Sequence, residues 1–187
     1  MRPSRRKARE VALQAMYEAE IGRTDLSVAL DQALEANPMG QELQDYTRRL
    51  VEGIDKEWRN LDSKIAPLVQ DYDYERIVTI DKNLMRIAAY EFFHEPTIPP
   101  AVSINEAVTI AKKYSTAESG RFVNGVLASL LQISPKANWD PTALSSEAEE
   151  FAAPEPEPEV EEEFIEADSD RAKEVARVAG WRLRGSD

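Results

Sequence analysis

The chain has 187 residues, no cysteine and a formal net charge of −12 at pH 7. The absence of cysteine excludes disulfides, thiolate metal sites and a cysteine nucleophile, and it fits a reducing compartment. No apolar run approaches the roughly 18 residues of a membrane span, and the first residues lack the apolar stretch of a signal peptide. We therefore expect a cytoplasmic protein without membrane association.

The charge is divided unevenly along the chain. Residues 136–187 hold 15 acids and 6 bases, whereas residues 1–135 hold 20 acids and 17 bases. The Pro/Glu-rich stretch "AAPEPEPEVEEEFIEADSD" cannot bury enough apolar surface to offset its ordering entropy. Residues 136–187 are therefore predicted to form a mostly disordered acidic tail, with room for one short helix in "DRAKEVARVAGWRLRG".

Apolar periodicity predicts four helices in the first half of the chain, over Ser4–Glu20, in "TDLSVALDQALEANP", over about Gln41–Trp58 and over roughly Asn60–Val69. Thr24 or Asp25 is the expected N-cap of the second helix, which Asn37 and Pro38 end. Pro67 is expected to kink or shorten the fourth helix.

After the connector "QDYDYERIVT", the pattern predicts three more helices, in "IDKNLMRIAAYEFFHEP", "SINEAVTIAKKY" and "STAESGRFVNGVLASLLQI". Ser103 and Glu106 stand three residues apart, which predicts a capping box at the start of the second of these. Ser119 is the expected cap of the last helix, and Gly125 inside it suggests close packing of a neighbour. Because no strand or hairpin signal occurs, the expected fold class is all-α.

The sequence offers no recognisable catalytic site. His94 is the only histidine, so a histidine pair for a metal cannot form, and no histidine-based relay is evident. No Walker loop or dinucleotide fingerprint occurs among the seven glycines. We expect a protein that is not an enzyme and that uses neither a cofactor nor a metal.

Two stretches suggest contact with a nucleic acid. In "MRPSRRKARE" four cations crowd a helix start, where the helix dipole favours acids. Such a cluster forms either a phosphate site, because backbone N–H groups add to the side chains, or a solvated frayed end. In "SGRFVNGVL", Phe122 is either a stacking face for a base or a core residue. Composition alone leaves both questions open.

Four motifs stand in register: "RRKARE.ALQA.Y" at 5–17, "ID..LMRIAAYE" at 80–91, "IP..V.INEAV.IAK.Y" at 98–114 and "FVNGVL" at 122–127. Together they resemble the family of the transcription antitermination factor NusB, over essentially residues 4–133. The resemblance implies an all-helical bundle of two subdomains, at about 1–72 and 78–135. It also implies a non-catalytic adaptor that binds boxA RNA together with the ribosomal protein NusE. Such an adaptor joins an RNA polymerase antitermination complex and supports transcription of ribosomal RNA operons.

The resemblance also implies site residues. The implied RNA contacts are Arg5, Arg6, Lys7, Arg9, Tyr17, Glu118, Ser119, Arg121 and Phe122. The implied surface for NusE consists of Asp81, Lys82, Met85 and Arg86.

Alternatives stay open beside this interpretation. The chain could be a protein–protein adaptor or a homodimer in which RNA binding is secondary or conditional. The similar helical module of RNA-modifying methyltransferases is disfavoured, because the 52 residues after 135 cannot hold a cofactor-binding domain. The acidic tail either solvates the protein or competes with RNA for Arg5, Arg6 and Arg9.

Overall fold

The computed structural model describes residues 4–69 and 73–140. Within these ranges the regular elements are all helical and none is a strand, which confirms the all-α fold class. The α-helices are α1 (Arg5–Gly22), α2 (Leu26–Ala36), α3 (Gln41–Ile65), α4 (Thr79–His94), α5 (Pro100–Tyr114) and α6 (Ser119–Gln132). Two short 3₁₀ helices, η1 (Ala66–Leu68) and η2 (Tyr74–Arg76), lie between α3 and α4.

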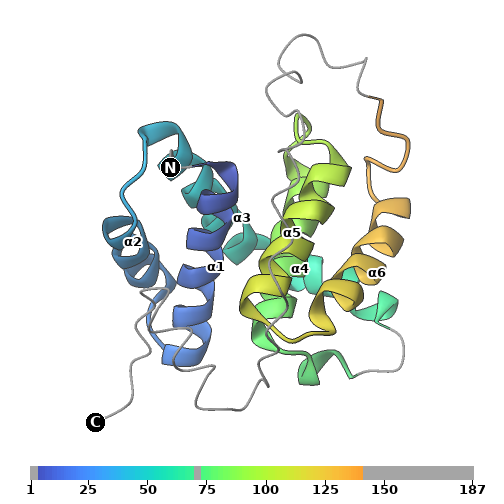
Figure 1. Ribbon diagram of the computed structural model, residues 1–187, viewed down its shortest axis with the longest axis horizontal. Helices are drawn as coiled ribbons and strands as arrows, with labels where there is room; N and C mark the ends of the chain where they lie inside the picture. Colours follow the sequence, from blue (N-terminus) through green and yellow to red (C-terminus); the bar gives the residue numbers. More distant parts are fainter. Residues whose placement is uncertain (1–3, 70–72, 141–187) are drawn as a thin grey trace.

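The helices share one apolar core. Helix α1 packs against α2, α3 and α4, while α5 packs against α4 and α6. Figure 1 shows α1 and α5 side by side in the centre of the molecule, with α3 and α4 behind them. Leu13, Leu50, Met85, Ile110 and Leu127 come from five of these helices and belong to a single buried cluster. The division into two subdomains stays a prediction.

The ends of α1 and α2 follow from local caps. The Ser4 side chain accepts a hydrogen bond from the backbone N–H of Lys7, which makes Ser4 the N-cap of α1. Asp25 caps α2 by accepting from the N–H of Ser27 at 2.9 Å, and Asn37 ends that helix. These boundaries confirm the prediction for the second helix, with Asp25 rather than Thr24 as its cap.

Helix α3 is longer than predicted. The expected break after Trp58 is wrong, because α3 continues without interruption to Ile65. Ile54, Leu61 and Ile65 keep the helical spacing and are all buried, so the apolar stripe runs through the expected break. Pro67 lies in the following 3₁₀ turn rather than inside an α-helix.

Two expectations about α5 and α6 are also wrong. Helix α5 starts at Pro100 with Pro99 as its N-cap, so Ser103 and Glu106 lie inside the helix and form no capping box. Proline at the first helical position has its φ already set for the helix, which explains the earlier start. Gly125 is exposed, and a Cβ added there would meet nothing within 4 Å, so no neighbour packs closely against it.

The segment after α6 folds back onto the body at the turn between α4 and α5. Lys136 is buried, and its Nζ donates to the backbone carbonyls of Glu95 and Ile98, each at 2.5 Å. Burial lowers the pKa of Lys136 to about 8. Residues expected at the start of the acidic tail are thus part of the packed structure. The remaining expectations for the tail, from residue 141, lie outside the described residues.

No helix within residues 4–69 and 73–140 is both long enough and apolar enough to cross a membrane.

Candidate nucleic-acid interface

The first turn of α1 carries cations and no acid. Arg5, Arg6 and Lys7 follow the N-cap Ser4 directly. The N–H groups of a helix start lack intrahelical partners and give this end a partial positive charge. Side-chain cations at this point therefore add to a backbone that already favours an anion.

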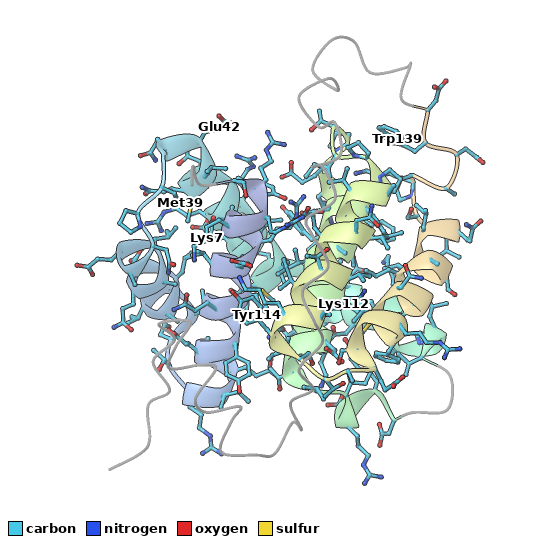
Figure 2. The ribbon with its side chains drawn as sticks, in the orientation of Figure 1. Lys7, Met39, Glu42, Lys112, Tyr114 and Trp139 are labelled. Atoms are coloured by element: carbon cyan, nitrogen blue, oxygen red, sulfur yellow. The ribbon has the colours of Figure 1, made fainter. Side chains whose placement is uncertain are left out.

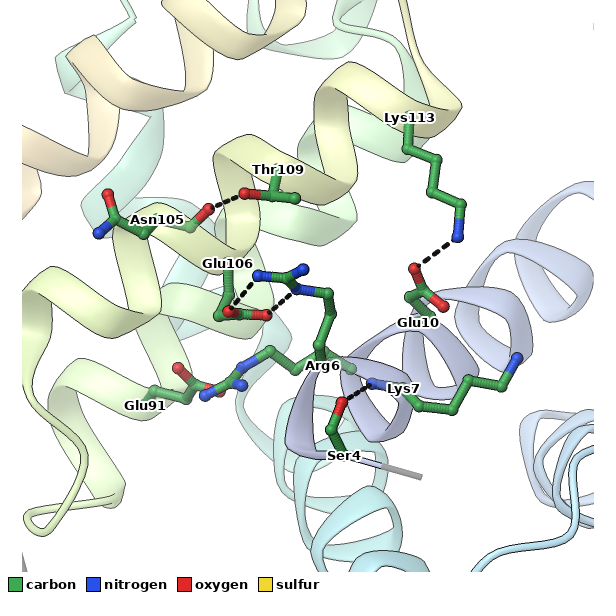
Figure 3. Close-up of polar contacts among 10 residues, drawn as sticks. Ser4, Arg6, Lys7, Glu10, Glu91, Asn105, Glu106, Thr109 and Lys113 are labelled. Carbon is green, nitrogen blue, oxygen red and sulfur yellow. Dashed lines mark hydrogen bonds and ion pairs between the residues drawn. The ribbon is translucent and has the colours of Figure 1, made fainter. Parts of the chain in front are cut away.

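Arg6 is held by a carboxylate of α5. Its Nε and Nη2 donate to the two carboxylate oxygens of Glu106 at 2.9 and 3.1 Å (Figure 3). Glu106 is buried, and the Arg6 side chain keeps 23% of its exposure. Two parallel bonds of this kind fix the guanidinium plane as well as its position. Arg6 therefore joins α1 to α5, and this structural role is independent of any contact with RNA.

Arg9 does not reach the surface at all. Its side chain is 2% exposed, and its Nε donates to the carboxylate of Glu91 at 2.7 Å. The Tyr46 hydroxyl donates to the same carboxylate oxygen at 2.5 Å. Burial would lower the pKa of Arg9, but the charge of Glu91 raises it overall, so the guanidinium stays protonated. The expected RNA contact does not fit this burial, which gives Arg9 a place in the core.

Arg5 and Lys7 extend toward solvent. The Arg5 guanidinium lies 3.4 Å from Glu42 and over the ring of Tyr46, with its side chain 32% exposed. Lys7 extends away from Glu106 (Figure 3), and its ammonium forms no ion pair within the part of the chain that the structure describes. Among the cations of this turn, Lys7 is the best placed to meet an anion.

Two lysines of α5 connect α1 to α6. Lys113 is largely exposed, and its Nζ donates to Glu10 at 3.0 Å, one turn along α1 from Lys7. The stem of Lys112 lies over Gly120 of α6, where an added Cβ would be 2.9 Å from Lys112 Cγ. Figure 2 shows Lys7 and Lys112 on neighbouring helices in the centre of the molecule.

We call Lys7, Lys112, Lys113 and Arg121 the cationic strip. Arg121 is exposed in the first turn of α6 and follows Gly120 directly. The strip joins the two stretches that the sequence suggested as RNA-binding. Sequence reasoning missed Lys112 and Lys113. Their signal was the pair of lysines ending "SINEAVTIAKKY", but cations in the last turn of a helix are already explained by the helix dipole.

The other expected RNA contacts near this strip differ in exposure. Glu118 is exposed, Tyr17 and Phe122 are half-buried against the core, and Ser119 is fully buried. Burial raises the pKa of Tyr17, so its hydroxyl stays neutral. Part of the Phe122 side chain is thus available to a base, whereas Ser119 points inward.

Ser119 is bonded to Asp81 of α4. Its Oγ donates to Asp81 Oδ2 at 2.6 Å, and it accepts from the backbone N–H of Thr116 at 3.2 Å. The N-cap of α6 is Glu118, whose side chain makes no capping bond, so the expected Ser119 cap is wrong. Burial raises the pKa of Asp81, although hydrogen bonds from serines lower it.

The four residues expected to meet NusE are largely internal. Met85 is fully buried, and Asp81 and Lys82 are only 4% and 6% exposed. Arg86 donates to both carboxylate oxygens of Asp62, at 2.8 and 2.6 Å. These side chains hold α4 against its own neighbours, and their contact with NusE stays a prediction.

Across residues 4–69 and 73–140, no group of three or more histidine, cysteine or acidic side chains is arranged to hold a metal ion.

The sequence matches the model of the NusB family over residues 6–132. The transcription antitermination protein NusB of Symbiobacterium thermophilum is 40% identical over 137 residues, which cover 69% of this chain and 90% of that protein. The NusB protein of Methylacidiphilum infernorum is 38% identical over 140 residues, covering 73% and 96%.

Solved structures show the same fold. The T. maritima NusB structure superposes with a TM-score of 0.69 at 32% identity, covering 74% of this chain and 99% of that one. A crystal structure of the antitermination factors NusB and NusE in complex with double-stranded RNA matches with a TM-score of 0.63 at 22% identity, covering 69% and 96%.

Proposed function

The chain belongs to the NusB family of transcription antitermination proteins, and we propose that it binds boxA RNA through its cationic strip, together with the protein NusE. The observation that carries this proposal is that α1, α5 and α6 each bring a cation of the strip toward the surface. Cations from α1, α5 and α6 reach solvent on helices that touch one another through Lys113–Glu10 and Lys112–Gly120.

The cationic strip supplies affinity for the RNA phosphates, and the start of α6 supplies preference for particular bases. Lysine and arginine side chains neutralise phosphates whatever the base sequence. Sequence-specific recognition of single-stranded RNA instead needs unstacked bases on aromatic faces and polar edges. The partly exposed Phe122 stands one residue after Arg121 of the strip, so both kinds of contact fall in one turn of helix.

The experiment is a binding titration of the full chain with boxA RNA, alone and with NusE. A scrambled RNA of the same length is the control. We expect preference for boxA, a gain in affinity with NusE, and a slope of log affinity against log salt of roughly −3 for four neutralised phosphates. Equal binding of both RNAs, or a slope near zero, contradicts the proposal.

In this function the protein acts as an adaptor in the cytoplasm, without a catalytic step of its own, and links RNA to an RNA polymerase antitermination complex. The competing reading is a homodimer that uses the same surface for self-association. Sedimentation with and without boxA RNA separates the two. If the dimer dissociates when RNA binds, self-association and RNA binding use the same surface. If RNA binds and the dimer persists, the strip lies outside the dimer interface.

A further inference from the structure

Asp81 is a buried carboxylate whose full hydrogen-bonding capacity is not used. It lies in the first turn of α4 and is 4% exposed. Its Oδ2 accepts from Ser119, while Oδ1 is buried without a hydrogen-bond partner among the described residues. A buried carboxylate oxygen without a hydrogen bond destabilises the folded state, so its presence calls for an explanation.

Helix α6 lacks a cap of its own. Its N-cap residue Glu118 has helical backbone angles and makes no side-chain bond, and the first turn of α6 contains no acid. The carboxylate of Asp81 comes from another helix and reaches the first residue of α6 through Ser119. A negative charge near a helix start is stabilising, so Asp81 supplies from α4 the acid that the first turn of α6 lacks.

The turn between α5 and α6 is organised around the same hydroxyl. Ser119 Oγ accepts from the Thr116 N–H at 3.2 Å and lies 2.7 Å from Thr116 Oγ1 and 2.9 Å from Ser115 Oγ. A hydroxyl offers one donor and two acceptor sites, so donating to Asp81 leaves acceptor sites for at most two of these three contacts. The position of residues 115–119 is therefore tied to α4 by the Asp81–Ser119 bond.

We propose that Asp81 is a positioning residue for RNA recognition: through Ser119 it fixes the start of α6 and so the orientation of Arg121 and Phe122. This inference rests on the proposed function. It replaces the expected direct contact of Asp81 with NusE, which its burial does not favour.

The test uses Asp81→Ala and Asp81→Asn in the full chain, with Asp31→Ala as the control for an exposed acid on α2. Asn keeps an oxygen that accepts from Ser119, whereas Ala removes the bond. We expect Asp81→Ala to weaken boxA binding by about tenfold or more, Asp81→Asn to restore most of it, and Asp31→Ala to change nothing.

Three readouts separate positioning from other roles. Binding of scrambled RNA and the salt slope should change much less than boxA binding in Asp81→Ala, because no cation is lost. A loss shared equally by boxA and scrambled RNA, or one that only follows the folded fraction in circular dichroism, overturns the inference. A loss of NusE binding with boxA binding intact identifies Asp81 as a partner contact and also overturns it.

Ser119→Ala serves if Asp81→Ala fails to fold, because it removes the same bond with a smaller change. It should lose boxA preference in the same way, and full boxA preference in folded Ser119→Ala contradicts the inference. If the unaltered chain does not prefer boxA, the proposed function itself fails. If it does, and the folded variants bind equally well, only the role of Asp81 fails.

Discussion

Arg9 of α1 and Glu91 of α4 form an ion pair inside the helical bundle, with 2.7 Å between Nε and Oε1 and almost no exposure of either side chain. Tyr46 of α3 donates to the same carboxylate, so one buried site joins three helices. Removing one member of such a pair leaves the other charged and unpaired in the interior.

Arg9→Ala should therefore lower the free energy of unfolding by about 3–5 kcal/mol, since Glu91 would remain buried without its cation. Arg5→Ala is the control, because the Arg5–Glu42 pair is largely exposed and should change stability by about 1 kcal/mol or less. Urea unfolding monitored by circular dichroism measures both variants. Equal midpoints for the two variants would contradict the core role of Arg9.

Lys7→Ala should weaken RNA binding with little effect on stability, because the Lys7 ammonium has no ion-pair partner within the described ranges. The salt slope should become less steep by about 0.7, the value for one phosphate contact on single-stranded RNA. Lys56→Ala is the matched control, since Lys56 is an exposed lysine on α3. An unchanged slope in Lys7→Ala would remove Lys7 from the interface.

Arg6 and Glu106 should show strong thermodynamic coupling. Each single alanine substitution leaves a partner without its two hydrogen bonds, whereas the double substitution removes both groups. The double variant should be more stable than the sum of the single effects predicts, by about 1 kcal/mol or more. Chemical unfolding of all four proteins measures this difference, and simple additivity would show that the pair adds nothing. RNA binding by Arg6→Ala must be compared at equal folded fraction.

Gly125 and Gly53 should respond oppositely to alanine. Gly125→Ala should stabilise the protein by about 0.5–1 kcal/mol, because Ala favours the helix and the added methyl meets nothing within 4 Å. Gly53→Ala should destabilise it, since the new Cβ would lie 2.3 Å from the Tyr90 ring. Thermal unfolding measures both changes. Tyr90→Leu should partly rescue Gly53→Ala, and a failure to rescue would place the clash elsewhere.

Lys136 should make stability depend on pH above neutrality. Burial lowers its pKa from 10.5 to about 8, so between these values the unfolded chain binds more protons than the folded one. The contribution of Lys136 to the free energy of unfolding therefore rises as pH rises from about 8 to 10. The urea midpoint of the unaltered chain should therefore rise relative to that of Lys136→Met as the pH increases over this range. Parallel curves would contradict the lowered pKa.

The helices were predictable wherever their signals are local. For α2, the N-cap Asp25, the C-cap Asn37 and the apolar spacing between them suffice to place the helix. The break in α3 was predicted wrongly because Trp58 and Arg59 interrupt the apolar pattern without being helix breakers. Neither glycine nor proline occurs there, so nothing ends the helix before Ile65.

The candidate site was harder to predict because its residues have distant partners. Glu106 matched a capping box by sequence spacing, yet its partner is Arg6, 100 residues earlier. Arg9 belongs to the same basic run as Arg5 and Lys7, and only the packing of α4 shows that it is buried. A helix start rich in cations therefore mixes two roles, core ion pair and surface charge, that composition cannot separate.

These long separations have a consequence for synthesis of the chain. Glu91 follows Arg9 by 82 residues, and Lys113 follows Glu10 by 103. At about 5–20 residues per second, α1 waits on the order of 5–20 seconds for its ion-pair partners on α4 and α5 to be made. Until then the Arg9 guanidinium has no carboxylate to accompany it into an apolar interior. Helix α1 can thus pack on α2 and α3 early, but its ion pairs with α4 and α5 form late, and the bundle stays unfinished until those helices are made.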